Sequence, residues 1–302
     1  MELILSISLG SKTRDHQVEI EVAGKKFLLK RIGCDGDFKQ ARELFLKYDQ
    51  EVAAFGLGGM NLDLGIGDRK YKIPQAHNLI KDVKSPVVDG SGLKATLEKE
   101  VINQVANSIA IKDKKVLLVS AIDRFGMAEA FKEQGAKLLC GDLIFALKFP
   151  LAIKSLAVLE TLARVSLPLI SKLPFKILYP TGEKQTKSQE KFSKYFKEAK
   201  IIAGDFHYIR YYSPKELADK IIITNTVTRT DRARLRKKGV KKLITTTPKL
   251  KGRSFGTNVI EALLTTLVDK DVNQITNDDY FKVLDLLEFK PKIEELKTSK
   301  IS

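Results

Sequence analysis

Small polar and charged side chains follow most of the short apolar runs in this sequence, and those runs have the length of buried strands. Ligands of an open parallel sheet bind outside the carboxyl ends of its strands, so residues in this shared position predict one ligand site. Taken singly, each is explained as well by a helix cap or a turn residue. In chain order these residues are Asp89, Ser120, Asp123, Asp142, Asp205, His207, Asn225, Thr226 and Thr246.

The segment GDFHYIR at 204–210 brings a carboxylate, an imidazole and a guanidinium into one loop after an apolar run. A carboxylate beside an imidazole holds its tautomer and raises its basicity, which is the arrangement that a general acid or base needs. Asp205 and His207 are therefore candidate catalytic residues, and Arg210 is a candidate anion ligand. A structural hydrogen-bonding role for His207 is the alternative.

Three glycine-bearing loops lead into helical segments, where free N–H groups and the helix dipole favour an anion. They are DGSGLK at 89–94, SAIDRFG at 120–126 and GRSFGTN at 252–258. The last is the strongest phosphate or carboxylate candidate, because its arginine adds a forked donor. None of the three matches a Walker or a GxGxxG motif. The residues expected to bind the anion are Arg253, Ser254, Gly256, Thr257 and Asn258, together with Arg210.

The order of the apolar runs predicts repeated strand-loop-helix units. Residues 114–143 give a strand, a polar turn, an amphipathic helix stopped by Gly135 and a second strand, which is the βαβ pattern of a parallel sheet. Near the amino terminus, Gly24 marks the turn of a hairpin and Asp37 is placed to cap a helix. The carboxyl-terminal lysine-rich tail is expected to fray.

We therefore expect an α/β protein in two domains. Residues 1–108 would form an N-terminal α/β domain on the substrate side. Residues 109–302 would form a Rossmann-like, nucleotide-binding parallel sheet with helices on both faces, carrying a leucine-rich helical insertion at about 143–198. Lysines and prolines interrupt that insertion, so it predicts a packed amphipathic helix and no transmembrane segment, with a homodimer through it left open.

Composition narrows the class of protein and its partners. The 302 residues carry a formal net charge of +16 and two cysteines, and no cysteine or histidine spacing of a metal site is present. Together with the absence of a signal-peptide pattern at the amino terminus, this favours a cytoplasmic protein without a metal. The lysines are scattered and lack an aromatic-basic stripe, so a small anionic molecule is favoured as partner over nucleic acid.

Six segments together resemble bacterial proteins that carry the name quinate 5-dehydrogenase, and in part the wider quinate/shikimate dehydrogenase family. They are FGLGGMNLDL, VVDGSGLKATLEK, VLLVSAIDRFGMAEAF, IAGDFHYIR, IIITNTVT and GRSFGTNVIEALL. The resemblance implies that Asp89 moves a proton together with a lysine, for which Lys72 and Lys94 are candidates. It implies NAD or NADP as cofactor, although SAIDRFG stands where that family has a glycine-rich turn. The residues expected at the cofactor are Ser120, Ala121, Asp123, Arg124, Gly126, Asp142, Asn225, Thr226 and Thr246.

Three functions follow from these observations. The leading one is an NAD(P)-dependent oxidoreductase, an enzyme that acts on a hydroxylated cyclic carboxylic acid such as quinate. The first alternative is a transferase or lyase that acts on a nucleotide or phosphorylated substrate between two domains. The second alternative is a non-catalytic ligand-binding or nucleic-acid-associated protein, which the net charge motivates.

Overall fold

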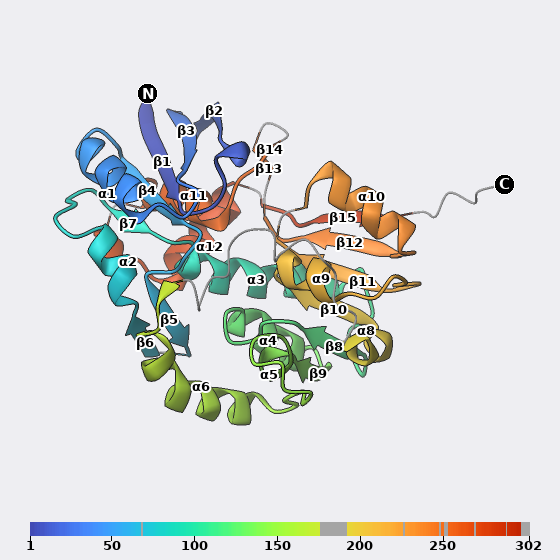
Figure 1. Ribbon diagram of the computed structural model, residues 1–302. Coiled ribbons are helices and arrows are strands. Elements are labelled where there is room, and N and C mark those ends of the chain that lie inside the picture. The colour runs from blue at the N-terminus through green and yellow to red at the C-terminus, as the bar shows by residue number, and fades with distance from the viewer. Residues whose placement is uncertain are drawn as a thin grey trace. The chain divides into compact units, whose positions relative to one another are not determined.

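The computed structural model describes residues 1–67, 69–175, 192–225, 227–247, 249–250, 253–268, 270–287 and 289–296 (Figure 1). The chain divides into two compact units. Unit 1 is Met1–Thr96, Ser166–Thr181 and Lys249–Phe289, and unit 2 is Leu97–Val165, Gly182–Pro248 and Lys290–Ser302. The expected boundary near Ser108 differs from this division, because the helix α11 (Thr257–Thr265) packs with the amino-terminal strands.

Unit 1 contains a five-stranded sheet in which every neighbouring pair is parallel except β2 with β3. The hairpin predicted at Gly24 is confirmed: Ala23 and Gly24 both adopt positive φ, as a tight turn between twisted strands requires. Across the sheet the strands are β2 (His16–Val22), β3 (Lys25–Gly33), β1 (Glu2–Ser8), β4 (Ala54–Gly58) and β7 (Val87–Val88).

Helices pack on both faces of this sheet, and its central strand β1 meets a different helix on each face. Leu5 and Ile7 point toward helix α1 and share a core cluster with Phe45. Ser6 points to the opposite face, where it meets Asn258 of α11. The other elements with residues in unit 1 are η1 (Lys12–Arg14), α1 (Phe38–Lys47), β5 (Asp63–Ile66), β6 (Arg69–Lys72), α2 (Pro74–Leu79), α3 (Ser91–Ala106), β13 (Lys249–Leu250), β14 (Arg253–Ser254), α11 (Thr257–Thr265), η4 (Val272–Gln274) and α12 (Asn277–Leu286).

Glycines allow α11 to lie directly on the sheet of unit 1. A Cβ built on Gly56 would lie 2.8 Å from the backbone oxygen of Asn258, and one on Gly90 would lie 2.7 Å from the backbone nitrogen of Asn258. Gly90 also has a φ of +92°, which other residues rarely adopt. The start of α11 is therefore packed against strand β4 and the end of β7.

Unit 2 contains a six-stranded sheet with five parallel strands and one antiparallel edge strand. The strands β8, β10 and β11 are buried on both faces, which explains why they read as continuous apolar runs. Across the sheet the strands are β15 (Lys292–Glu295), β12 (Lys242–Thr245), β11 (Ile221–Thr224), β10 (Ile201–Gly204), β8 (Lys115–Leu118) and β9 (Lys137–Cys140).

The helices of unit 2 pack partly through an aromatic cluster. Phe145, Phe196 and Tyr212 join Leu117 and Ile202 of the sheet in one core. Within the ranges given above, no helix is both long and apolar enough to cross a membrane. These helices are α4 (Phe125–Glu133), α5 (Asp142–Phe145), α6 (Leu156–Ile170), which continues into residues of unit 1, α8 (Ser193–Glu198), α9 (Phe206–Tyr212) and α10 (Arg229–Lys237).

The α/β class and the parallel sheets with helices on both faces are confirmed, whereas the Rossmann-like assignment is not. In chain order the parallel strands of unit 2 lie as 2-1-3-4-5, and the dinucleotide-binding fold has the order 3-2-1-4-5-6. The prediction that the carboxyl-terminal tail frays was wrong in part, because its residues Lys292–Glu295 pair with β12. The expected insertion at 143–198 is described up to residue 175 and again from residue 192, and its central part lies outside the described residues.

We predict that Gly56→Ala lowers the free energy of unfolding by about 1–3 kcal/mol, because the added methyl group would overlap the backbone of α11. Gly65→Ala is the matched control, since a Cβ there meets nothing closer than 3.5 Å. Urea unfolding of both variants measures the difference. Equal stability of the two variants would contradict the close packing of α11.

Candidate functional site

The carboxyl edge of the sheet in unit 2 collects most of the predicted site residues. Ser120 follows β8, Asp142 follows β9, Asp205 follows β10, Asn225 follows β11 and Thr246 follows β12. Since these strands are parallel neighbours, all five residues lie along one edge. Thr226 lies outside the described residues. Among the residues that are described, no three His, Cys, Asp or Glu side chains gather as they would around a metal ion.

Arg124 is the centre of this edge. Its guanidinium is buried, with a side chain 2% exposed, and it forms ion pairs through Nη1 with Glu98 of α3 and through Nη2 with Asp205 Oδ2 at 3.3 Å. Burial lowers the pKa of Arg124, and the charge of Asp205 opposes that shift. Glu98 was missed in the sequence. Its signal was a carboxylate on the apolar face of the helix, beside Leu97 and Val101.

Asp205 and Asn225 form a hydrogen-bonded pair over the ends of β10 and β11. Asn225 Nδ2 donates to Asp205 Oδ2 at 3.2 Å, and Asp205 Oδ1 accepts the backbone N–H of His207 at 2.8 Å. Asp205 is therefore the N-cap of α9, and the His207 side chain is exposed to solvent. The contact between Asp205 and His207 is therefore that of a helix cap and does not involve the imidazole. Arg210, the third candidate site residue of this segment, lies on α9, where its Nη1 is 3.6 Å from Asp231 Oδ1 in an ion pair.

Asp142 holds the turn that follows β8. Its two oxygens accept the backbone N–H groups of Ala121 at 3.1 Å and Ile122 at 3.0 Å. Burial raises the pKa of Asp142 to about 6. Both oxygens therefore accept hydrogen bonds from the turn after β8. Gly126 is buried in the first turn of α4, and Asp123 is exposed.

Three buried polar atoms at this edge have no hydrogen-bond partner within the part of the chain that the structure describes. They are Ser120 Oγ, Arg124 Nε and Glu98 Oε2. A buried polar atom left unpaired costs about 1–3 kcal/mol, so native proteins pair nearly all of them. Two of the three atoms belong to the ion pair of Arg124 with Glu98, and the third belongs to the residue that follows β8 at this edge.

At the corresponding edge of the sheet in unit 1, the carboxylate of Asp89 accepts hydrogen bonds from the backbone of the chain. Asp89, expected to move a proton, accepts the N–H of Leu62 at 2.6 Å through Oδ2 and that of Ser91 at 2.8 Å through Oδ1. It therefore fixes a loop and the start of α3. Of its candidate partners, Lys72 is exposed on β6 and Lys94 is half-buried on α3.

Glu261 is a second carboxylate at the start of α3, and it was missed in the sequence. It accepts the N–H of Gly90 at 2.5 Å and of Leu93 at 3.1 Å, and the hydroxyl of Tyr280 at 2.9 Å. Burial, reinforced by the charge of Asp89, raises the pKa of Glu261 to about 7. Its signal in the sequence was an acidic residue inside the apolar run NVIEALL.

In the predicted anion loop at 252–258, the end formed by Gly256, Thr257 and Asn258 is used for packing. Gly256 is the N-cap of α11, half-buried Thr257 begins the helix, and Asn258 Nδ2 donates to Ser6 Oγ at 2.8 Å. The backbone nitrogen of Asn258 lies against Gly90. The backbone at Arg253 and Ser254 forms β14, and their side chains lie outside the described residues.

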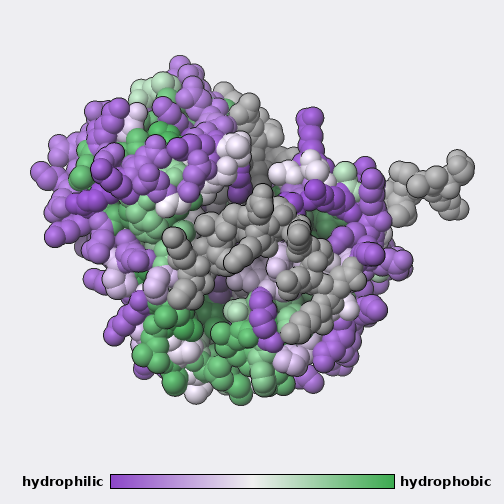
Figure 2. Space-filling view, in the orientation of Figure 1, coloured by the Kyte–Doolittle hydropathy of each residue, from purple (hydrophilic) through white to green (hydrophobic). Residues whose placement is uncertain are grey.

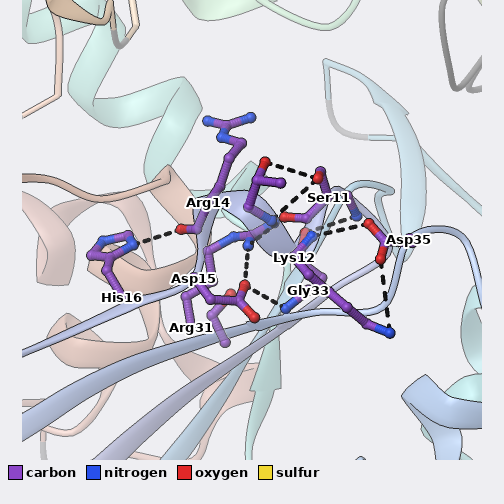
Figure 3. A network of polar contacts seen from close by, with 12 residues as sticks. Ser11, Lys12, Arg14, Asp15, His16, Arg31, Gly33 and Asp35 are labelled. Carbon is purple, nitrogen blue, oxygen red and sulfur yellow. Dashed lines mark hydrogen bonds and ion pairs between the residues drawn. The ribbon is translucent and has the colours of Figure 1, made fainter.

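A further polar network in unit 1 joins the ends of β1 and β3 (Figure 3). Arg31 Nη1 donates to Asp15 Oδ1 at 2.6 Å and to the Ser11 carbonyl at 3.0 Å, and the N–H of Gly33 donates to Asp15 Oδ1 at 2.7 Å. Asp35 accepts the N–H of Lys12 at 3.0 Å. The groups of this network pair with one another, so it braces the loop after β1.

Comparison with known proteins shows the family. Residues 92–296 match the Domain of unknown function (DUF8754), and the chain belongs to this family. Residues 3–89 match the Domain of unknown function (DUF8753). No curated protein matches the chain.

Solved structures similar to the chain include sugar-binding proteins of transport systems. A sugar ABC transport system substrate-binding protein from Bordetella parapertussis 12822 is 10% identical, with a TM-score of 0.39, over 99% of this chain and 91% of that one. A galactofuranose binding protein is 14% identical, with a TM-score of 0.40, over 99% and 96%. A periplasmic solute binding protein from Actinobacillus succinogenes 130z with bound D-allose is 8% identical, with a TM-score of 0.38, over 100% of both chains.

The family comparison contradicts the resemblance to quinate 5-dehydrogenases, because the two families that match the chain are DUF8754 and DUF8753. The prediction of an NAD(P)-dependent oxidoreductase is therefore wrong, and neither catalytic function is retained. The expected cytoplasmic location is not retained either.

We predict that the free energy of unfolding falls by up to about 3 kcal/mol as the pH rises from about 4.5 to about 7, through Glu261 alone. The raised pKa means that the folded chain binds this proton more tightly than the unfolded chain, so stability is greatest below the unfolded pKa and is lost through the folded one. Glu261→Gln removes this titration. Urea unfolding across that pH range measures the difference between the two proteins.

The stability advantage of the native chain over Glu261→Gln should shrink as the pH rises. A difference that stays constant from pH 4.5 to 7 would show that Glu261 titrates normally.

Proposed function

We propose that this protein is a non-catalytic binding protein for a small, neutral, polyhydroxylated ligand, held at the carboxyl edge of the sheet in unit 2. The observation that carries the proposal is the buried pair of Arg124 and Glu98 beside Ser120, each with one buried polar atom unpaired in the described chain. A ligand that reaches these atoms removes the cost of leaving them unpaired.

The strand order supports this location. The chain order of the parallel strands reverses between β8 and β10, and ligands of open α/β sheets bind at such a switch point. Ser120 follows the first of these strands and Asp205 follows the second. The unpaired atoms therefore lie where the topology predicts a ligand.

The chemistry of the three atoms favours hydroxyl groups. Arg124 Nε can only donate, Glu98 Oε2 accepts when ionised, and Ser120 Oγ can do both. A hydroxyl group also donates and accepts, so a ligand with several hydroxyls can satisfy all three atoms at once.

The charge at this edge argues against an anionic ligand. Glu98 and Asp205 already flank the one buried guanidinium, and Asp123 and Asp142 follow β8 and β9. A phosphate or carboxylate placed here would meet more negative than positive charge. The net charge of +16 on the whole chain is thus not concentrated at this site.

The test is isothermal titration of the full chain with neutral hexoses, pentoses and their alditols, and with hexose phosphates and NAD. We expect binding by at least one neutral compound, and Ser120→Ala should weaken it about tenfold, equivalent to about 1.4 kcal/mol. The substitution should leave stability intact, because the Ser120 hydroxyl has no partner in the described chain.

Ser6→Ala is the matched control. It removes an acceptor of Asn258 in unit 1, so it should lower stability and leave the affinity for the neutral ligand unchanged. Tighter binding of the phosphates than of the neutral sugars, or equal affinity of Ser120→Ala and the native chain, would overturn the proposal.

A further inference from the structure

Helix α6 carries an exposed apolar face. We call this face the apolar stripe: Val158, Leu162, Val165 and Leu169, which follow one another at intervals of four, three and four residues and are between 41 and 72% exposed. That spacing places all four on one side of a helix. The opposite side is also apolar, and its Leu156, Leu159, Ala163 and Leu167 are buried. A helix that is apolar all round is normally covered on all sides.

The loop that precedes α6 extends the apolar surface. Leu147, Phe149 and Leu151 are each more than half exposed. Figure 2 shows hydrophobic residues gathered where Figure 1 places α6. Seven large apolar side chains exposed within one segment exceed what soluble monomers usually leave to water, and such patches mark a protein partner or a membrane.

The charges around the apolar stripe are basic. Between residues 147 and 173 the sequence has Lys148, Lys154, Arg164 and Lys172, and a single acidic residue, Glu160. Glu160 is paired within the helix, where Arg164 Nη2 donates to its Oε1 at 2.6 Å. Lys154 and Lys172 are exposed just before and just after α6. The surface is therefore apolar along its length and positively charged at both ends.

We propose that the apolar stripe docks this protein flat onto an anionic lipid bilayer. The leucines, valines and Phe149 would enter the boundary between headgroups and acyl chains, as amphipathic interfacial helices do. Lys154 and Lys172 would contact anionic headgroups, each adding affinity that salt can screen. The excess positive charge of the chain acts in the same direction.

Charge complementarity favours a lipid surface over a second copy of the chain. If two stripes paired in antiparallel fashion, Lys154 of one copy would face Lys172 of the other. If they paired in parallel, each lysine would face its own counterpart. Both arrangements bring like charges together, whereas an anionic bilayer neutralises them.

The test is co-sedimentation of the full chain with vesicles made of equal parts phosphatidylcholine and phosphatidylglycerol, and with phosphatidylcholine vesicles. We expect binding to the mixed vesicles, at least about tenfold weaker binding to phosphatidylcholine alone, and release by high salt. The double variant Val165→Asp with Leu169→Asp should lose at least about tenfold in affinity. Both side chains are exposed, so its thermal unfolding should match that of the native chain.

Leu286→Asp is the matched control, because it also replaces an exposed leucine, 64% exposed on α12, with an aspartate outside the stripe. It should bind the mixed vesicles as the native chain does. Equal vesicle binding by the double variant, or equal affinity for both kinds of vesicle, would overturn the proposal. So would sedimentation equilibrium showing a dimer that the double variant dissociates, without binding to either vesicle. None of these outcomes depends on the ligand of unit 2.

Discussion

The candidate site of unit 2 depends on the ion pairs that the buried guanidinium of Arg124 forms with Glu98 and Asp205. A charge taken out of water costs several kcal/mol unless it is paired, and removing one partner of such a pair is costly. Arg124 stands at the start of α4, Glu98 belongs to α3, and Asp205 caps α9. One charge therefore joins two helix starts and the interior of a third helix, and it keeps the ends of β8 and β10 in register with them.

The two sheets share one topological feature but differ in how the polar groups at their carboxyl edges are paired. In each, the strand order reverses next to the first parallel strand, which is where α/β sheets bind ligands. In unit 1, glycines admit α11, and Asp89 and Glu261 pair with backbone N–H groups. In unit 2 the same kind of edge leaves polar atoms unpaired in the described chain. The contrast locates the proposed ligand in unit 2.

Local sequence patterns predicted turns and helix caps, which depend on neighbouring residues. They failed to predict packing and burial, which depend on residues far away in the sequence. Gly24 predicted the hairpin and Asp37 the helix cap because both act within one turn. The place of α11 in unit 1 depends on contacts such as that of Asn258 with Ser6, which are 252 residues apart, and no local pattern contains them. Glu98 and Glu261 were not singled out in the sequence, because their burial depends on residues far away along the chain. The resemblance to dehydrogenases rested on six short segments, and Asp89, which belongs to one of them, binds backbone N–H groups.

Because unit 1 is built from segments far apart in the sequence, its parts are translated at different times. The five strands of unit 1 are complete by Val88, whereas the helix that covers one of their faces begins only at Thr257. Domains generally fold as they leave the ribosome, and an uncovered sheet face is prone to aggregation. In this protein, the first sheet to be translated must therefore wait, with Ser6 and its glycines exposed, until nearly all of unit 2 has been made.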